Sequence, residues 1–190
     1  MNNQLSIQKE DINKLPLYSF NGSITLIESK KDALKAIKEL KKEPILGFDT
    51  ETRPSFRKGE SHPVSLLQFA TKTNAYLFRL NKFPFKYELA SILEDENIVK
   101  TGVAIRDDIK ALEKLYPFTA NSFIDLADVA KEKNITCFGL RALTAIFLKK
   151  RLSKTAKTSN WAQPTLTPAQ ISYAACDAVV SFRIYQELHR

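Results

Sequence analysis

The chain has 190 residues, of which 44% are hydrophobic and 26% are charged, a composition typical of an ordinary globular domain. It has only two histidines, and its two cysteines, Cys137 and Cys176, are far apart, which argues against histidine-based catalysis, a disulfide or a zinc site. The formal net charge of +8 favours a polyanionic partner such as a nucleic acid.

The sequence contains no membrane signal. Residues 1–16 have no apolar core of signal-peptide length, and no later run approaches the roughly 18 apolar residues of a membrane span. We therefore expect a cytoplasmic protein with no membrane partner, and no protein partner is evident. We expect one domain over residues 1–190, in which residues 1–15 form an N-terminal extension.

An edge strand, a helix and a second strand are predicted first along the chain. Residues 18–29 (YSFNGSITLIES) read as an edge strand or one arm of a hairpin. Ser29 is a typical helix N-cap, and apolar residues then recur with a helical period as far as Leu40. Residues 45–51 follow Pro44 and form a short apolar run, which predicts a buried strand.

The predicted strand at 45–51 carries two acids, Asp49 and Glu51, within the stretch GFDTETRPSF. Because side chains alternate across a strand, the two carboxylates share one face and lie about 7 Å apart. Like charges at this distance repel each other, and desolvation increases the repulsion unless a cation lies between them. The pair therefore favours a divalent metal site, and a solvated strand end is the alternative.

The middle of the chain predicts a hairpin and then alternating helices and strands. A polar loop (52–63) leads into strands at 64–71 and 75–80, which a turn at 72–74 joins. A short strand is predicted at 97–102, and helices are predicted at 86–93, 107–115, 126–133 and 140–149. This order predicts an α/β fold with a mixed sheet flanked by helices on both faces.

Two more acids, Asp107 and Asp108, open the helix predicted at 107–115. Asp is a common N-cap residue, so capping by itself explains one of them. A helix that begins at a strand end can also aim a carboxylate at a site beside the sheet. We assign the cap to Asp107 and the site to Asp108.

The last helix begins with a capping box, in which Thr167 is the cap, Pro168 lies in the first turn and Gln170 comes three residues after the cap. Tyr173 and Asp177 are four residues apart, so they lie on one face of this helix. The small residues around Asp177 let the helix approach the sheet closely, which leaves the acid in need of a partner. A solvent-facing polar stripe is the alternative. The basic segment before the helix, residues 149–167, has no periodicity and holds the only Trp.

Three motifs resemble, in this order, those of the DEDD superfamily of 3′–5′ exonucleases. They are FDTET (48–52), GVAIRDDIKAL (102–112) and SNWAQPTLTPAQISYAACDA (159–178). The resemblance extends over about residues 24–188 and is strongest to the exonuclease domain of the Werner-syndrome helicase and to the nuclease domain of ribonuclease D. It implies a ribonuclease H-like fold.

The resemblance also implies a site and an activity. The metal ligands that it implies are Asp49, Glu51, Asp108 and Asp177. Tyr173, four positions before the last acid, places the chain in the tyrosine branch (DEDDy) and would orient the attacking water. Two Mg²⁺ or Mn²⁺ ions, which prefer oxygen ligands, would support hydrolysis of DNA or RNA from the 3′ end to nucleoside 5′-monophosphates. The residues assigned to substrate binding are Thr50, Thr52 and Trp161, with a place in the core as the alternative for Trp161.

Two other functions are weighed against this one. A haloacid-dehalogenase-type phosphatase requires a DxDxT motif, but Glu51 stands at its second acid and Arg53 at its threonine. A non-catalytic nucleic-acid-binding module on the same fold usually lacks carboxylates that this chain retains. We therefore expect an enzyme.

Basic residues are expected to flank the acidic site. They are the segment 149–157 (KKRLSKTAK) together with Arg53, Arg57 and Lys58. No accessory domain follows Arg190 in this sequence, so we expect a distributive enzyme that releases its strand after one or a few nucleotides.

Overall fold

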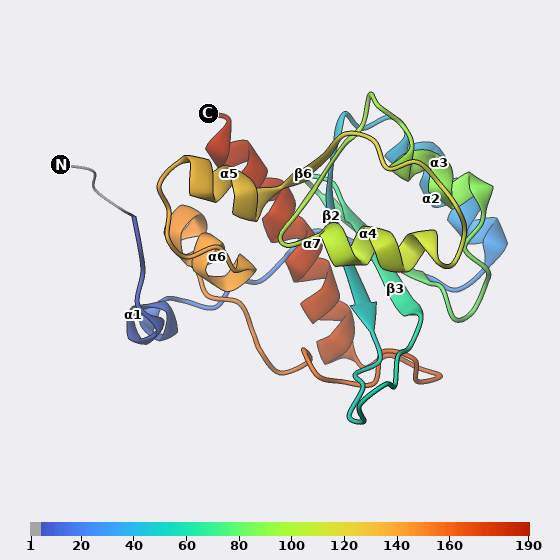
Figure 1. Cartoon of the computed structure of the whole chain (residues 1–190), viewed down its shortest axis with the longest axis horizontal. Coiled ribbons are helices and arrows are strands. Elements are labelled where there is room, and N and C mark those ends of the chain that lie inside the picture. The colour runs from blue at the N-terminus through green and yellow to red at the C-terminus, as the bar shows by residue number, and fades with distance from the viewer. Residues whose placement is uncertain (1–4) are drawn as a thin grey trace.

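The computed structural model describes residues 5–190, in which a mixed sheet lies between two layers of helices (Figure 1). The six strands of this part of the chain are β1 (Ser23–Ile27), β2 (Ile45–Thr52), β3 (Val64–Ala70), β4 (Asn74–Arg79), β5 (Val99–Gly102) and β6 (Phe123–Asp125). Its helices are α1 (Lys9–Lys14), α2 (Lys30–Leu40), α3 (Tyr87–Leu93), α4 (Arg106–Glu113), α5 (Leu126–Glu132), α6 (Leu140–Leu148) and α7 (Pro168–Leu188). The α/β fold with helices on both faces is confirmed.

The strand order is β1-β4-β3-β2-β5-β6. β2, β3 and β4 form an antiparallel meander, which confirms the predicted hairpin, whereas β1, β5 and β6 each pair in parallel with a neighbour. β1 lies at an edge parallel to β4, so the hairpin-arm interpretation of residues 18–29 is wrong. The three residues of β6 are too few to give a strand pattern in the sequence, and this strand was not predicted.

The pairing of β2 leaves part of it open. β5 pairs with β2 only from Ile45 to Gly47, so among the described residues no strand lies beside the second half of β2 on this side. After β5 the chain continues into α4, which lies next to this open half. The second half of β2 carries the acidic motif, so its edge is accessible to side chains from α4.

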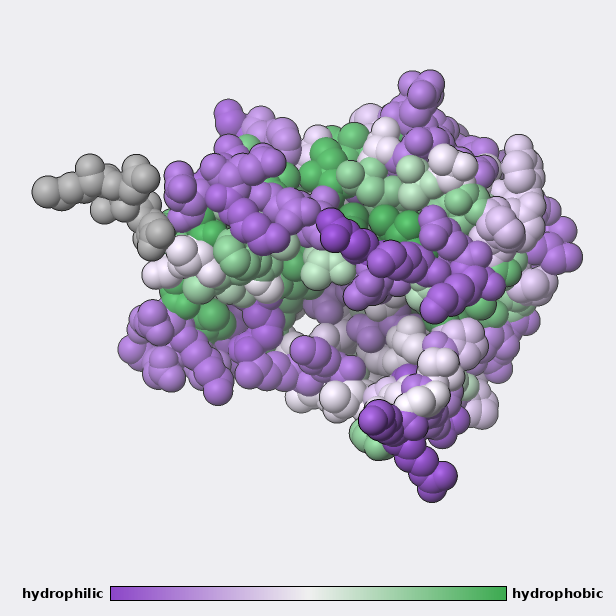
Figure 2. Space-filling model, viewed as in Figure 1, coloured by the Kyte–Doolittle hydropathy of each residue, from purple (hydrophilic) through white to green (hydrophobic). Residues whose placement is uncertain are grey.

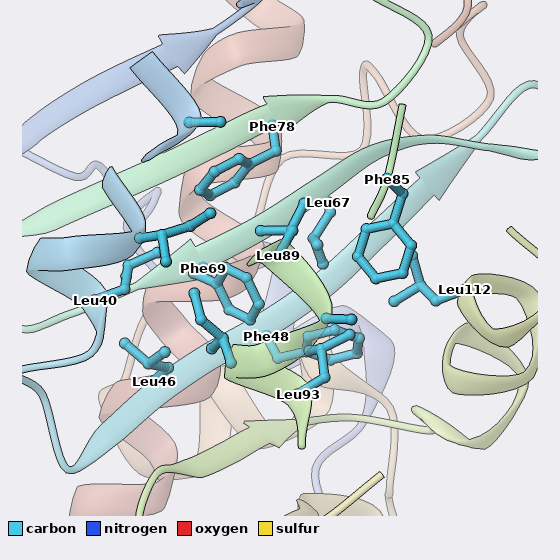
Figure 3. Close-up of a cluster of buried hydrophobic side chains, with 14 of the residues drawn as sticks. Leu40, Leu46, Phe48, Leu67, Phe69, Phe78, Phe85, Leu89, Leu93 and Leu112 are labelled. Carbon is cyan, nitrogen blue, oxygen red and sulfur yellow. The ribbon is translucent and has the colours of Figure 1, made fainter. Parts of the chain in front are cut away.

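Apolar side chains of β2, β3 and β4 pack against α2, α3 and α4 on one face of the sheet (Figure 3). Phe48, Phe69 and Phe78 are wholly buried, and the ring of Phe69 lies 6.1 Å from that of Phe48 and 6.0 Å from that of Phe78. On the other face, apolar residues of β3 and β4 pack against α7 in a second core, and α5, α6 and α7 form a third core among themselves. Because Phe48 points into the first core, its neighbours Gly47 and Asp49 point towards α7.

Gly47 is the point of closest approach between β2 and α7. A Cβ atom placed on Gly47 would lie 2.0 Å from the carbonyl oxygen of Ala178 and 3.0 Å from Cβ of Phe182. Ala174, Ala175 and Ala178 are fully buried in α7, which confirms that small residues bring this helix close to the sheet. The contact therefore sets the distance between Asp177 of α7 and the acids of β2.

We expect Gly47→Ala to lower the free energy of unfolding by about 2–3 kcal/mol, because the added methyl meets rigid backbone and must push α7 away from the sheet. In a domain of this size each kcal/mol corresponds to about 2–4 °C of melting temperature. Thermal unfolding followed by circular dichroism measures the loss. Gly139→Ser is the matched control, because a Cβ there meets no atom within 4 Å and Ser is a favourable residue at this helix N-cap. Equal melting temperatures for the two variants would contradict this account of the contact.

The expected N-terminal extension, residues 1–15, is described from residue 5 onward, and residues 1–4 lie outside the described part. It contains α1, a six-residue helix that is too short to be recognised by periodicity. Ile12 is the buried residue of this helix. Leu5 forms an isolated bridge with Ile135, and α1 contacts α6. Among residues 5–190, no helix has both the length and the apolar character needed to cross a membrane.

Candidate active site

Three carboxylates from β2 and α7 converge on one face of the sheet. One oxygen of each of Asp49, Glu51 and Asp177 lies within 4.8 Å of an oxygen of the other two. Asp49 and Glu51 share the face of β2 that faces α7, as their alternation predicted. Asp177 comes from α7, whose capping box is formed as predicted by Thr167 and Gln170.

Asp108 lies beside this group and does not belong to it. Its Oδ1 accepts a hydrogen bond from Oγ1 of Thr50, across the open edge of β2. Its charge nevertheless contributes to raising the pKa of Asp49 and of Glu51, so it lies close to the cluster. The structure thus brings three of the four predicted acids together and holds the fourth at their flank.

The structure shows the places of two further assigned residues near Asp108. Thr50 is buried, and its hydroxyl donates to Asp108, so this side chain positions the acid, and its assignment to substrate binding stays a prediction. Asp107 does not cap α4: the N-cap residue is Ile105, and the Asp107 side chain is 96% exposed near Lys110. The backbone N–H of Ile105 instead donates to Asp125 of β6, a strand that was not predicted.

The acidic cluster strongly disfavours its own negative charge. Burial, reinforced by the charges of Asp177 and Glu51, raises the pKa of Asp49 well above its usual value. Burial and the same type of repulsion raise the pKa of Glu51 to about 9. Burial also raises the pKa of Asp177 to about 7, although a hydrogen bond with Tyr173 and the charge of Lys157 oppose this rise. Like charges held this close require protons or cations.

We expect Mg²⁺ to raise the melting temperature more at pH 8 than at pH 6. Without metal, the raised pKa values of Glu51 and Asp177 contribute stability that is fully present below their ordinary values of 4.5 and 3.8 and is lost as the pH rises through about 9 and about 7. A cation replaces the protons lost at high pH. We expect the two increases to differ by at least about 2–4 °C, the effect of one kcal/mol in a domain of this size.

Scanning calorimetry with chelator and with Mg²⁺ at both pH values measures this difference. An equal increase at pH 6 and pH 8, or a larger one at pH 6, would contradict metal binding by the cluster.

Tyr173 lies one helical turn before Asp177 and packs against Trp161, with 6.0 Å between the ring centroids. Burial, together with the charges of Asp177 and Glu51, raises the pKa of the Tyr173 hydroxyl above its usual value. The hydroxyl therefore keeps its proton at neutral pH and interacts with the Asp177 carboxylate as a hydrogen-bond donor.

Trp161 is wholly buried, so the assignment of this side chain to substrate binding is corrected in favour of the core. Its loop is anchored to the end of β4: the fully buried Arg79 donates to the carbonyl of Gln163, and Asn81 donates to that of Ala162 at 3.1 Å. The buried Trp161 ring therefore packs against the Tyr173 ring and holds it in place. Thr52, the third predicted substrate contact, is partly buried at a β-bulge next to Glu51.

The carboxylates open into a cleft of about 470 Å³ between α6 and the start of α4, where the surface is visibly hollowed (Figure 2). Lys154 and Lys157, from the basic segment 149–157, line this cleft as expected. Arg141, in the first turn of α6, lines it too and was not predicted; the only signal was one cation in an otherwise apolar helix. Arg53, two residues after Glu51, lines a second cavity beside Val64 and Leu80.

Comparison with known proteins agrees with this arrangement. The family model described as 3′–5′ exonuclease matches residues 24–190. This chain belongs to that family. The exonuclease–helicase WRN of Mus musculus is 32% identical to it over 185 residues, which cover 92% of this chain and 13% of WRN. The chain spans less than half the length of the first curated relatives that it matches.

Two solved exonuclease structures share the fold. The EXO domain of Aedes aegypti Nibbler superposes with a TM-score of 0.82 at 23% identity, covering 90% of this chain and 91% of that one. Escherichia coli RNase D gives a TM-score of 0.80 at 19% identity, covering 87% and 44%. The predicted ribonuclease H-like fold and the resemblance to DEDD exonucleases are confirmed, and such enzymes depend on divalent metal ions.

Proposed function

We propose that this chain hydrolyses DNA or RNA strands from the 3′ end and releases nucleoside 5′-monophosphates, using two Mg²⁺ or Mn²⁺ ions. The observation that carries the proposal is the convergence of Asp49, Glu51 and Asp177 within 4.8 Å, flanked by Asp108. In support, a structure of Trypanosoma brucei RNase D, which shares the fold with a TM-score of 0.78, contains RNA U12.

The donor set fits the proposed ions. Four ionised carboxylates carry four negative charges, which balance two divalent cations. Oxygen ligands without imidazole suit Mg²⁺ or Mn²⁺ better than zinc. Asp49, Glu51 and Asp177 would hold one ion between them, and Asp108, oriented by Thr50, would help to hold the second beside Asp49. When bound, the two ions would activate the attacking water and neutralise the charge on the leaving 3′ oxygen.

The role proposed for Tyr173 is to aim the attacking water at phosphorus. Its hydroxyl lies beside Asp177 and keeps its proton, so it can hold a water by a hydrogen bond but is poorly suited to act as a base. Trp161 and the anchored loop fix the ring from behind. The wholly buried indole therefore affects the reaction through Tyr173 and not by touching substrate.

We expect Tyr173→Phe to slow the chemical step by about 10–100-fold, the effect of losing one hydrogen bond to a polar or charged partner. Metal affinity should stay nearly unchanged, because the carboxylates are intact. Single-turnover hydrolysis and a metal titration followed by melting temperature separate the two effects. A Phe variant as fast as the parent chain would remove Tyr173 from the mechanism.

The test of the proposed function is digestion of 5′-labelled single strands of DNA and RNA with the same sequence, with Mg²⁺ or Mn²⁺. We expect the strands to be shortened from the 3′ end, which gives a ladder of labelled products, and 5′-mononucleotides to be released. Comparison of the DNA and RNA ladders gives the preference for one sugar directly. A circular single strand is the control, since it has no end. Cuts in the circle, or no product from any linear strand, would contradict the proposal.

A further inference from the structure

Gln68 of β3 lies directly beside the acidic cluster. It is the residue opposite Asp49 in the antiparallel pair of β2 and β3. Side chains of directly opposite residues lie on the same face of a sheet, with their Cβ atoms about 4.5–5.5 Å apart. Leu66 and Ala70, two positions to either side of Gln68 on β3, belong to the core that packs against α7. Gln68 therefore points towards α7, next to Asp49.

The amide group of Gln68 is buried without a hydrogen-bond partner. The residue has no exposed surface, and neither its Nε2 nor its Oε1 atom forms a hydrogen bond within residues 5–190. A buried amide without partners destabilises a fold. Of the residues directly opposite Gln68 or two positions along its strand, Leu66, Ala70 and Leu77 are apolar, and only Asp49 has a polar side chain. The polar group beside this amide is thus a predicted metal ligand.

The Asp49 carboxylate has acceptor sites to spare. An ionised carboxylate has about four acceptor sites on its two oxygens. Oδ1 accepts the backbone N–H of Thr50 at 2.9 Å, and one carboxylate oxygen belongs to the cluster with Glu51 and Asp177. These two uses leave acceptor capacity for an N–H group of Gln68. The Gln68 side chain is one methylene group longer than that of Asp49, which gives its amide the reach to span the space between the two strands.

We propose that Gln68 is a positioning residue, whose Nε2–H group donates to the Asp49 carboxylate and fixes it in the orientation that binds a metal ion. A hydrogen bond from an amide to an ionised carboxylate is charge-assisted, and the partners of a metal-ligating carboxylate set its orientation. The inference rests on the proposed function, because Asp49 has to be ionised and correctly oriented in order to hold the ion. Gln68 acts only through Asp49, since it is wholly buried.

Replacement of Gln68 by Met separates this role from a structural one. Met has nearly the same length but no N–H group, so the variant removes an unpartnered amide from apolar surroundings. If Gln68 served only the fold, the substitution would be neutral or stabilising and would leave metal binding unchanged. If Gln68 positions Asp49, Gln68→Met should weaken Mg²⁺ binding by about 10–100-fold, while the melting temperature in chelator stays equal or rises.

Titration calorimetry with Mg²⁺ and with Mn²⁺ measures the affinity without substrate, and thermal unfolding in chelator measures the fold. Thr101→Val is the matched control. The Thr101 hydroxyl is also wholly buried without a partner among the described residues, but Thr101 lies on β5, opposite Gly47 and not Asp49. This control should keep the metal affinity and turnover of the parent chain. Gln68→Leu, which removes the same amide with a different side-chain shape, guards against a packing defect peculiar to Met.

A double-mutant cycle identifies the acid through which Gln68 acts. In an Asp49→Asn background, Gln68→Met should slow single-turnover hydrolysis by no more than about twofold, because the carboxylate that the amide orients is already gone. In an Asp177→Asn background it should still slow hydrolysis by about tenfold, the effect of losing one hydrogen bond to a charged group.

The outcomes are distinct. If the parent chain binds metal but hydrolyses no strand, the proposed function fails, and the calorimetric comparison still decides the role of Gln68. If Gln68→Met binds metal as tightly as Thr101→Val does, the positioning role is overturned. An effect of Gln68→Met that persists with Asp49→Asn and disappears with Asp177→Asn would overturn the assignment to Asp49. A parent chain that binds neither ion would overturn the metal site and this inference together.

Discussion

Replacement of Asp49 by Asn is expected to lower kcat by at least roughly 10²–10³-fold, the effect of removing one preorganised electrostatic group from an active site. Asp49 lies in the cluster with the other two acids, and its Oδ1 accepts a hydrogen bond of 2.9 Å from the backbone N–H of Thr50. Asn has the same shape and keeps that bond, so the loss is one of charge and metal binding. Asp177→Asn should behave in the same way.

The same substitution should stabilise the metal-free fold. Burial and the neighbouring acids raise the pKa of Asp49, so at neutral pH its ionisation favours the unfolded chain; the neutral Asn does not carry this cost, and the melting temperature in chelator should rise while activity falls. Turnover of a labelled strand and thermal unfolding measure both effects. Asp107→Asn is the matched control, because that side chain is 96% exposed outside the cluster. Unchanged hydrolysis in Asp49→Asn would remove this residue from the site.

Removal of divalent cations is expected to abolish activity, and Mg²⁺ or Mn²⁺ should restore it. The reason is electrostatic: the cluster repels phosphate unless its charges are compensated, and burial intensifies this repulsion. Exhaustive chelation followed by titration of each metal, with turnover and melting temperature as readouts, measures the dependence. Two binding events that involve the cluster should be resolved by calorimetry, and Asp49→Asn should weaken both.

Activity that survives exhaustive chelation would contradict the two-ion proposal. Restoration of activity together with a single binding event would support a metal enzyme but contradict the count of two. Zinc is a useful negative comparison, since the cluster offers no imidazole or thiolate ligand among its three members.

Much of the site could be predicted because its signals are local. Alternation along a strand places Asp49 and Glu51 on one face, and the four-residue spacing in a helix does the same for Tyr173 and Asp177. The capping box at Thr167 begins α7 at the predicted residue. Each of these inferences depends only on backbone geometry within a few residues, which the amino-acid sequence sets directly.

The features that the sequence did not show involve partners distant in sequence. The hydroxyl of Thr50 donates to Asp108, 58 residues away. Trp161 precedes α7 in an aperiodic loop, and its burial depends on the anchoring of that loop to the end of β4 by Arg79 and Asn81. Asp107 is not needed as a cap because Asp125, from a strand too short to predict, binds the backbone at the start of α4.

The sequence by itself thus determined the α/β class, the faces on which the acids lie and the chemistry that those acids favour. The tertiary structure decided how near α7 comes to β2 at Gly47 and which acids have oxygens within 4.8 Å of one another. It also decided that Arg141 lines the same cleft. The physical reason is that periodicity fixes the direction of a side chain relative to its own element, whereas distances between elements depend on close packing of whole surfaces.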